Sequence, residues 1–359
     1  MLELRQVSRI VDGETHIADV SMALAPGTLN VLLGPTLSGK TTLMRLMAGL
    51  DPPTTGRVLF DGVDVTGVPV RRRNVAMVYQ QFINYPSMTV YENIASPLRV
   101  AGADRATITR EVGRAAELMK LTPYLSRHPL ELSGGQQQRT ALARAIVKKA
   151  GRVLLDEPLA NLDYKLREEL REELPRIFAE SGAIYVYATT EPTEALLLGG
   201  NTATLHEGHV TQFGPTIDVY RRPADLRTAR IFADPPLNSI AATKRGDRFE
   251  LAGGLTIPVP AAFAGIADQA CTIAFRAHHL GLTPRGAESV PIDAKVIITE
   301  LTGSESFVHV DFAGARWVML AHGVHSFEPD TPVRLHLDLS YLMVFDASGA
   351  ALTASPLAA

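Results

Sequence analysis

The chain has 359 residues, of which 46% are hydrophobic and 20% charged, and its 35 basic and 38 acidic side chains give a formal charge of −3. This length predicts two or three domains, and the near-neutral balance excludes a broad basic surface, so we expect no nucleic-acid partner. The one cysteine, Cys271, cannot form an internal disulfide, which indicates a reducing compartment. The sequence shows neither a charged leader nor an apolar run of about 18 residues, so we expect a soluble chain that reaches membranes only through partners.

Short apolar runs alternate with helical stretches from the start of the chain to about residue 215. The clearest of these runs are Val31–Leu33, Val75–Tyr79, Val153–Leu155 and Ala183–Tyr187. Such runs between helices are typical of a parallel sheet covered on both faces. From about residue 87 to residue 150 the pattern is helical only, which predicts a helical subdomain inserted between two strands.

From about residue 236 the pattern changes to short β-type segments separated by Gly, Pro and Asp. The predicted strands are Leu255–Val259, Cys271–Arg276, Ala294–Leu301, Ser306–Phe312, Arg316–Leu320 and Val333–Leu339. Turns at this spacing predict a small all-β barrel or sandwich. We therefore expect an α/β domain over residues 1–235 and an all-β domain over residues 236–359.

A glycine-rich loop separates the run Val31–Leu33 from the predicted helix Thr41–Ala48. It matches G-x-x-x-x-G-K-[ST], in which backbone N–H groups and the positive end of the next helix surround phosphates. Lys40 is expected to reach the β- and γ-phosphates, and the Thr41 hydroxyl to ligate Mg²⁺. A chance match in a chain of this composition is on the order of one in a hundred. The predicted nucleotide-binding residues are Gly34, Pro35, Thr36, Ser38, Gly39, Lys40, Thr41 and Thr42.

Two acidic residues, Asp156 and Glu157, directly follow the apolar run Val153–Leu155. At the carboxyl end of a buried strand they would lie beside the phosphate loop. We expect Asp156 to hold Mg²⁺ and Glu157 to polarise the attacking water. The structural alternative is a solvated turn ahead of Pro158.

A second predicted helix start with anion-binding character lies at Leu132-Ser133-Gly134-Gly135-Gln136. This pentapeptide resembles the signature of ABC-type ATPases, which are P-loop NTPases with a parallel-sheet core and a helical subdomain. The resemblance implies that Ser133, Gly134, Gly135 and Gln136 close on ATP held by an opposite subunit.

Three further segments resemble ABC ATPase motifs in the same order along the chain. Met77–Gln80 is similar to the Q-loop, which implies that Gln80 senses the γ-phosphate and Mg²⁺. Ala160–Asp163 is similar to the D-loop, which implies that Asp163 lies at the subunit interface. Tyr85–Ile94 resembles the segment that meets the coupling helix of a permease in importers.

The resemblance extends into the C-terminal half. Asp218–Pro223, Phe275–Leu280 and Leu301–Glu305 are similar to the linker and the OB-like, TOBE-type regulatory domain of importer ATPases of the maltose and glycerol-phosphate type. The resemblance implies ATP and Mg²⁺ as cofactors, and a second ATPase subunit and two membrane permeases as partners. Indirectly it implies a periplasmic or extracellular solute-binding protein. It places the chain on the cytoplasmic face of the inner (plasma) membrane, held there by the permeases.

Three positions depart from the family pattern. Thr190 stands at the position of the switch histidine, and a hydroxyl cannot carry the positive charge of an imidazolium. Val11 stands where an aromatic side chain usually stacks on adenine, and Leu37 replaces a usual glycine. All three serve the nucleotide that this chain itself binds. The pattern therefore favours a heterodimer with an impaired P-loop site over a homodimer, and resembles glycerol importers with two non-identical ATPases.

The transported solute cannot be read from the sequence beyond a carbohydrate, a polyol such as glycerol, or a polyol phosphate. Two other functions stay open. One is a mainly structural or regulatory ATP-binding subunit with little hydrolysis. The other is a soluble ABC ATPase outside transport, which is disfavoured because one set of motifs is followed by a regulatory-type barrel.

Overall fold

The structure is a computed structural model that describes residues 1–352 apart from 82, 161, 285 and 287. Its contacts divide the chain into two units, Met1–Thr216 and Ile217–Ala359. The division precedes the boundary expected at residue 235 because α8 (Leu226–Ile231) packs within the second unit. Its residue Ala229 is fully buried with Ala274, Met343 and Phe345.

A six-stranded sheet forms the centre of the first unit, in the order β10-β9-β3-β8-β7-β6. Strands β9, β3, β8, β7 and β6 pair in parallel, and β10 is added antiparallel to β9. This arrangement confirms the predicted parallel sheet. Its strands are β3 (Leu29–Leu33), β6 (Val75–Val78), β7 (Arg152–Asp156), β8 (Ile184–Thr189), β9 (Asn201–His206) and β10 (His209–Pro215).

The predicted alternation of strands and helices is wrong at the N-terminus, where a second, antiparallel sheet forms. Its order is β2-β1-β4-β5. A two-residue turn at Asp12 (φ 51°) and Gly13 (φ 85°) joins the first two strands. A turn with positive φ at both positions matches the twist of a hairpin, so the chain folds back without a helix. The strands are β1 (Leu2–Val11), β2 (Glu14–Leu24), β4 (Thr55–Phe60) and β5 (Val63–Asp64).

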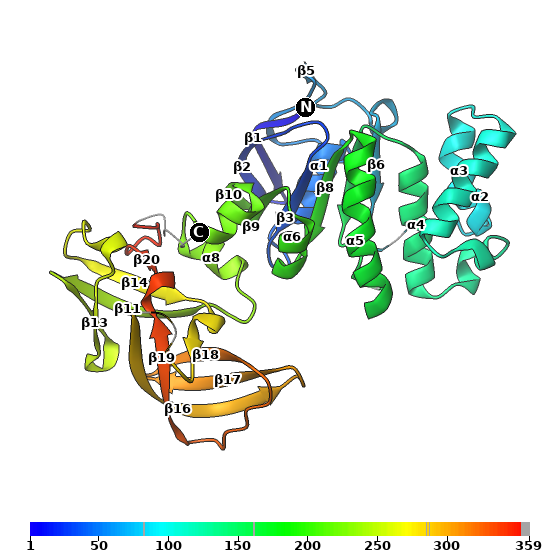
Figure 1. Cartoon of the computed structure of the whole chain (residues 1–359). Helices are drawn as coiled ribbons and strands as arrows, with labels where there is room; N and C mark the ends of the chain where they lie inside the picture. Colours follow the sequence, from blue (N-terminus) through cyan, green and yellow to red (C-terminus); the bar gives the residue numbers. More distant parts are fainter. Residues whose placement is uncertain (82, 161, 285, 287, 353–359) are drawn as a thin grey trace. The chain divides into compact units, whose positions relative to one another are not determined.

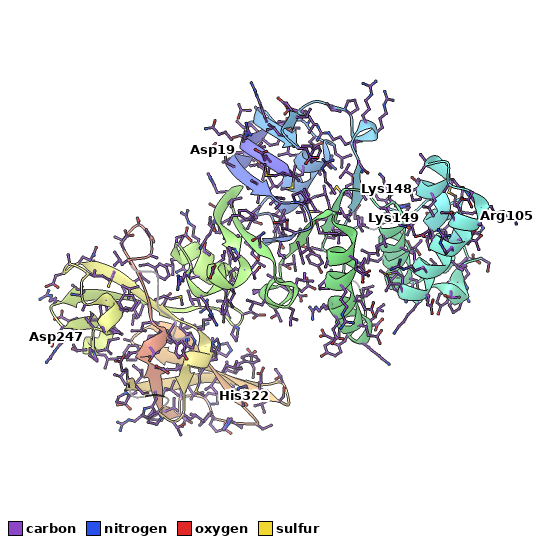
Figure 2. The ribbon with its side chains drawn as sticks, turned by 45° about the horizontal axis from the view of Figure 1, so that its top comes forward. Asp19, Arg105, Lys148, Lys149, Asp247 and His322 are labelled. Carbon is purple, nitrogen blue, oxygen red and sulfur yellow. The ribbon has the colours of Figure 1, made fainter. Side chains whose placement is uncertain are left out.

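The helices of the first unit form two groups (Figure 1). Helix α1 (Lys40–Ala48) buries its apolar face among strands of both sheets, α6 (Pro192–Leu198) contacts β3 and β8, and α5 (Tyr164–Ser181) contacts α6. Helices α2 (Val90–Val100), α3 (Arg105–Leu118) and α4 (Gly134–Val147) contact one another in the segment predicted to be helical. Figure 2 shows Lys148 and Lys149 at the end of α4, where the Lys148 ammonium donates to the Val75 carbonyl of β6 at 2.6 Å.

The second unit contains two five-stranded antiparallel sheets, β13-β12-β11-β14-β20 and β15-β19-β16-β17-β18. Both contribute to one core that includes Phe249, Ile273 and the fully buried Trp317, as expected for an OB-like domain. The helices α7 (Thr216–Arg221) and α8 precede these sheets. The strands are β11 (Asn238–Arg245), β12 (Arg248–Leu251), β13 (Thr256–Pro258), β14 (Ala270–Phe275), β15 (Leu280–Gly281), β16 (Ser289–Leu301), β17 (Glu305–Phe312), β18 (Ala315–His322), β19 (Pro332–Asp338) and β20 (Met343–Phe345).

Candidate nucleotide site

The glycine-rich loop connects β3 to α1, and its backbone needs glycine at two places. Gly39 caps α1 with φ 102°, and a Cβ there would lie 2.9 Å from the carbonyl oxygen of His16. A Cβ on Gly34 would lie 2.4 Å from the carbonyl oxygen of Leu205. Since backbone atoms cannot move aside cheaply, both positions exclude larger residues.

Leu37, which replaces a glycine of the family pattern, adopts φ 67°. This left-handed conformation costs an L-residue roughly 1–2 kcal/mol. The side chain is 95% exposed, so no packing within the chain offsets this cost. The loop thus keeps the conformation that a glycine would favour, at the expense of local strain.

The loop encloses a buried ammonium and a buried hydroxyl. Lys40 is 5% exposed, and its Nζ donates to the carbonyl oxygens of Gly34 (2.8 Å) and Pro35 (2.9 Å). Burial lowers the pKa of Lys40, and the nearby acidic side chains oppose that shift. The buried Oγ of Ser38 has no hydrogen-bond partner among the described residues. Both groups therefore have unused capacity for an anionic ligand.

The predicted carboxylates lie where β7 ends. The Thr41 hydroxyl donates to Oδ2 of Asp156 at 2.7 Å, and burial raises the pKa of Asp156. Glu157 has φ 45°, and its backbone N–H donates to the Ala188 carbonyl at 3.0 Å. The Gln80 amide donates to Oε2 of Glu157 at 2.9 Å, and burial raises the pKa of Glu157 as well. The structure thus brings four predicted residues into two hydrogen-bonded pairs, Thr41 with Asp156 and Gln80 with Glu157.

A cavity of about 650 Å³ opens over these groups. This volume is within the range of small-molecule sites. Val11 does not line this cavity, whereas Glu14, Thr15 and His16 of the β1–β2 hairpin do. Asp156 is buried and does not line the cavity itself. The lining residues are Glu14, Thr15, His16, Thr36, Leu37, Ser38, Gly39, Lys40, Thr41, Thr42, Gln80, Glu157, Thr190, Glu207 and Gly208.

Comparison with known proteins assigns the family. Residues 17–160 match the ABC transporter family. The chain is 34% identical over 352 residues to the ABC transporter ATP-binding protein YcjV of Escherichia coli, covering 96% of this chain and 97% of that protein. It is 35% identical over 325 residues to the sn-glycerol-3-phosphate import ATP-binding protein UgpC of Salmonella typhimurium, covering 89% and 91%. The chain belongs to the ABC transporter ATPases.

A solved structure agrees with this assignment. The dimeric post-hydrolysis state of the ATP-binding cassette MJ0796, bound to ADP and Pi, superposes with a TM-score of 0.56 and 27% identity. The match covers 60% of this chain and 99% of that one. The ABC P-loop fold and an ATPase function coupled to transport are thereby confirmed. Within the described residues, no helix is both long and apolar enough to span a membrane.

The ABC signature forms the first turn of α4. Ser133 caps the helix by accepting from the Gln136 N–H, and Oε1 of Gln136 accepts from the Ser133 N–H at 3.0 Å. Ser133 and Gly134 are exposed, and none of the four signature residues lines the cavity. On the same helix, buried Gln138 donates to the Pro158 carbonyl at 2.6 Å. No pattern in the sequence indicates this link between the signature helix and the carboxylate loop.

The D-loop and the switch position lie after β7 and β8. Asp163 caps α5 by accepting from the Leu166 N–H at 3.0 Å, whereas Asn161 of the same motif lies outside the described residues. Thr190, which the sequence places at the switch position, is exposed and lines the cavity with Glu157 and Gln80. It is followed by Glu191, whose ion pairs no pattern in the sequence predicts.

Proposed function

We propose that this ABC ATPase is the ATP-hydrolysing subunit of an importer for a carbohydrate, a polyol such as glycerol, or a polyol phosphate. The observation that carries the proposal is the likeness to an sn-glycerol-3-phosphate import ATP-binding protein over 89% of this chain, the all-β unit included. The chain would act on the cytoplasmic face of the membrane, held there by two permease subunits and fed indirectly by a solute-binding protein.

The phosphate loop supplies the grip on ATP. Backbone N–H groups from Gly34 to Thr42 and the start of α1 would hold the phosphates. Lys40 would exchange its two carbonyl acceptors for phosphate oxygens, and Ser38 would find the partner it lacks. The β1–β2 hairpin would form the wall beside the base through Glu14, Thr15 and His16, whereas Val11 at the end of β1 does not line the cavity.

The donor chemistry fits Mg²⁺. A hydroxyl and a carboxylate lie 2.7 Å apart at Thr41 and Asp156, and hard oxygen ligands are those that Mg²⁺ prefers. Gln80 would supply a third oxygen. When bound, the ion would neutralise charge on the phosphates, and its charge would favour the ionised form of buried Asp156.

Glu157 would direct the attacking water. Its raised pKa, caused chiefly by burial, makes the carboxylate a better proton acceptor than an exposed glutamate. The Gln80 amide holds one carboxylate oxygen, which leaves the other for water. This pair orients the base before substrate arrives.

We further propose that the partner ATPase is a different chain. Thr190 brings only a hydroxyl to the γ-phosphate, and losing a preorganised electrostatic contact can cost roughly 2.7–4 kcal/mol of transition-state stabilisation. The signature Ser133–Gln136 that this chain would offer to the opposite nucleotide is intact. Hydrolysis would therefore be slow at this chain's own P-loop and faster at the site its signature completes.

A groove beside the helical group supports permease docking. Its volume is about 510 Å³, and its lining comes from α2, α4, strand β6, the end of α1 and the segment that follows the Q-loop. Tyr85, Met88 and Val100 give it apolar walls, while Arg144 and Lys148 give it charge. A permease helix of mixed character fits these walls.

A second candidate is a regulatory subunit that binds ATP and rarely hydrolyses it, and exposed Thr190 favours it. The deciding assay measures hydrolysis by this chain alone and with its co-purified partner, with Glu157→Gln in each. We expect little activity alone, restoration in the complex, and a small further loss from Glu157→Gln in this chain. Robust hydrolysis by this chain alone would refute the asymmetric model, and no hydrolysis by any assembly would favour the regulatory one.

A further inference from the structure

One arginine on α5 joins the loop after β7 to the loop after β8. Arg167 donates from one terminal nitrogen to the Ala160 carbonyl at 3.1 Å. From the other it donates to Oε1 of Glu191 at 3.3 Å. Ala160 follows the base Glu157 by three residues, and Glu191 directly follows Thr190. A single side chain therefore contacts both of the loops that contribute Glu157 and Thr190 to the cavity lining.

The switch loop is anchored on both sides of Thr190. Glu191 also accepts from Arg171 at 2.8 Å, and its N–H donates to the Thr189 hydroxyl at 3.0 Å. Thr189 in turn donates to buried Glu194 at 2.6 Å. The ion-pair network of Arg167, Arg171, Glu191 and Glu194 thus fixes the residues that flank Thr190.

The geometry favours arginine over lysine at position 167. A planar guanidinium presents several donors in a fixed fork and can bind two acceptors in different directions, whereas a lysine ammonium is a compact point charge. The Arg167 side chain is 23% exposed, so its contacts are only partly screened by solvent. If Glu191 moves, Arg167 must either follow it or release one acceptor.

We propose that Arg167 is a positioning residue that couples the Ala160 loop to the switch loop carrying Thr190. A displacement at one loop is transmitted to the other through this guanidinium. The coupling gives Thr190, which lacks the charge of a histidine, a fixed place beside Glu157. The inference rests on the proposed function for its catalytic consequence, but the physical coupling itself is measurable without hydrolysis.

The first test is hydrogen–deuterium exchange on the full chain. Arg167→Gln should speed exchange of the peptide carrying the Ala160 and Leu162 amides about tenfold, since a charge-assisted hydrogen bond is lost. Glu191→Gln, on the other loop, should speed exchange of the same peptide to a smaller extent. The double variant should exchange no faster than Arg167→Gln. Arg176→Gln, an exposed arginine on the same helix, is the matched control.

The second test is steady-state ATP hydrolysis by the co-purified complex. Arg167→Gln should lower kcat of the complex by no more than Glu157→Gln of this chain does, with KM for ATP unchanged, and Arg167→Lys should restore part of the loss. Unchanged exchange at the Ala160 loop in Glu191→Gln, or additive losses in the double variant, would overturn the coupling. A rise in KM alone would assign Arg167 to nucleotide binding. If the wild-type complex hydrolyses no ATP, the proposed function fails, while the exchange measurement still decides the coupling.

Discussion

The strained conformation of Leu37 makes a prediction that can be worked out from the structure. With φ 67° and 95% exposure, this residue bears the cost of a left-handed backbone without packing in return. Replacement by glycine removes roughly 1–2 kcal/mol of strain. Glycine also gives the unfolded chain more freedom, which costs about 0.5–1 kcal/mol. Leu37→Gly should therefore stabilise the chain by about 0.75 kcal/mol, the centre of a range of about 0–1.5 kcal/mol.

The matched control is Leu37→Ala, which keeps the Cβ and with it the strain. Because the leucine side chain is exposed, its truncation should change stability by less than about 0.5 kcal/mol. Urea unfolding followed by far-ultraviolet circular dichroism reports on the first unit, which contains the long helices α1 to α5. Fluorescence of the one tryptophan, Trp317, reports on the second unit and should not change. A Leu37→Gly chain no more stable than Leu37→Ala would refute the strain argument.

Three further substitutions test the site. Asp156→Asn should stabilise the nucleotide-free chain at neutral pH, because burial raises the pKa of Asp156 and so disfavours its ionised form in the folded state. The gain in stability should shrink as the pH falls through that raised pKa toward 3.8. Unfolding curves that show the same gain at every pH would contradict this. Gly34→Ala places a Cβ 2.4 Å from the Leu205 carbonyl and should weaken ATP binding in calorimetry by roughly tenfold or more, so an unchanged affinity would count against it. Gln138→Ala leaves the Pro158 carbonyl without its donor and should cost about 1–2 kcal/mol in urea unfolding, so an unchanged unfolding midpoint would contradict this.

The sequence predicted those parts of the site that are local along the chain. The phosphate loop needs only a strand, glycines and a helix in succession, and the carboxylates need only a buried strand before them. In the structure the loop accordingly connects β3 to α1, and the carboxylates lie where β7 ends. The hairpin signal at Asp12-Gly13 was equally local, and its neglect produced the error at the N-terminus.

The contacts that bring distant segments together could not be predicted in this way. Arg167 and Arg171 stand four residues apart on α5, a spacing that any exposed helix face allows. Their partners Glu191 and Glu194 lie beyond the next strand, and nothing in the sequence distinguishes them from solvated acids. These ion pairs form only in the folded chain, where the loop after β8 lies beside α5.

Several residues of the P-loop site destabilise the nucleotide-free chain. Leu37 and Glu157 both have positive φ, and Lys40 and Asp156 are charges buried in the free chain. Each feature destabilises the chain by itself. A polyphosphate and its cation would satisfy Lys40 and Asp156 together, so nucleotide binding would offset these costs whatever the rate of hydrolysis at this site. Thr190→His tests this division: it should raise hydrolysis at this site and leave ATP affinity unchanged, and a gain in affinity without a gain in rate would show that position 190 serves binding instead.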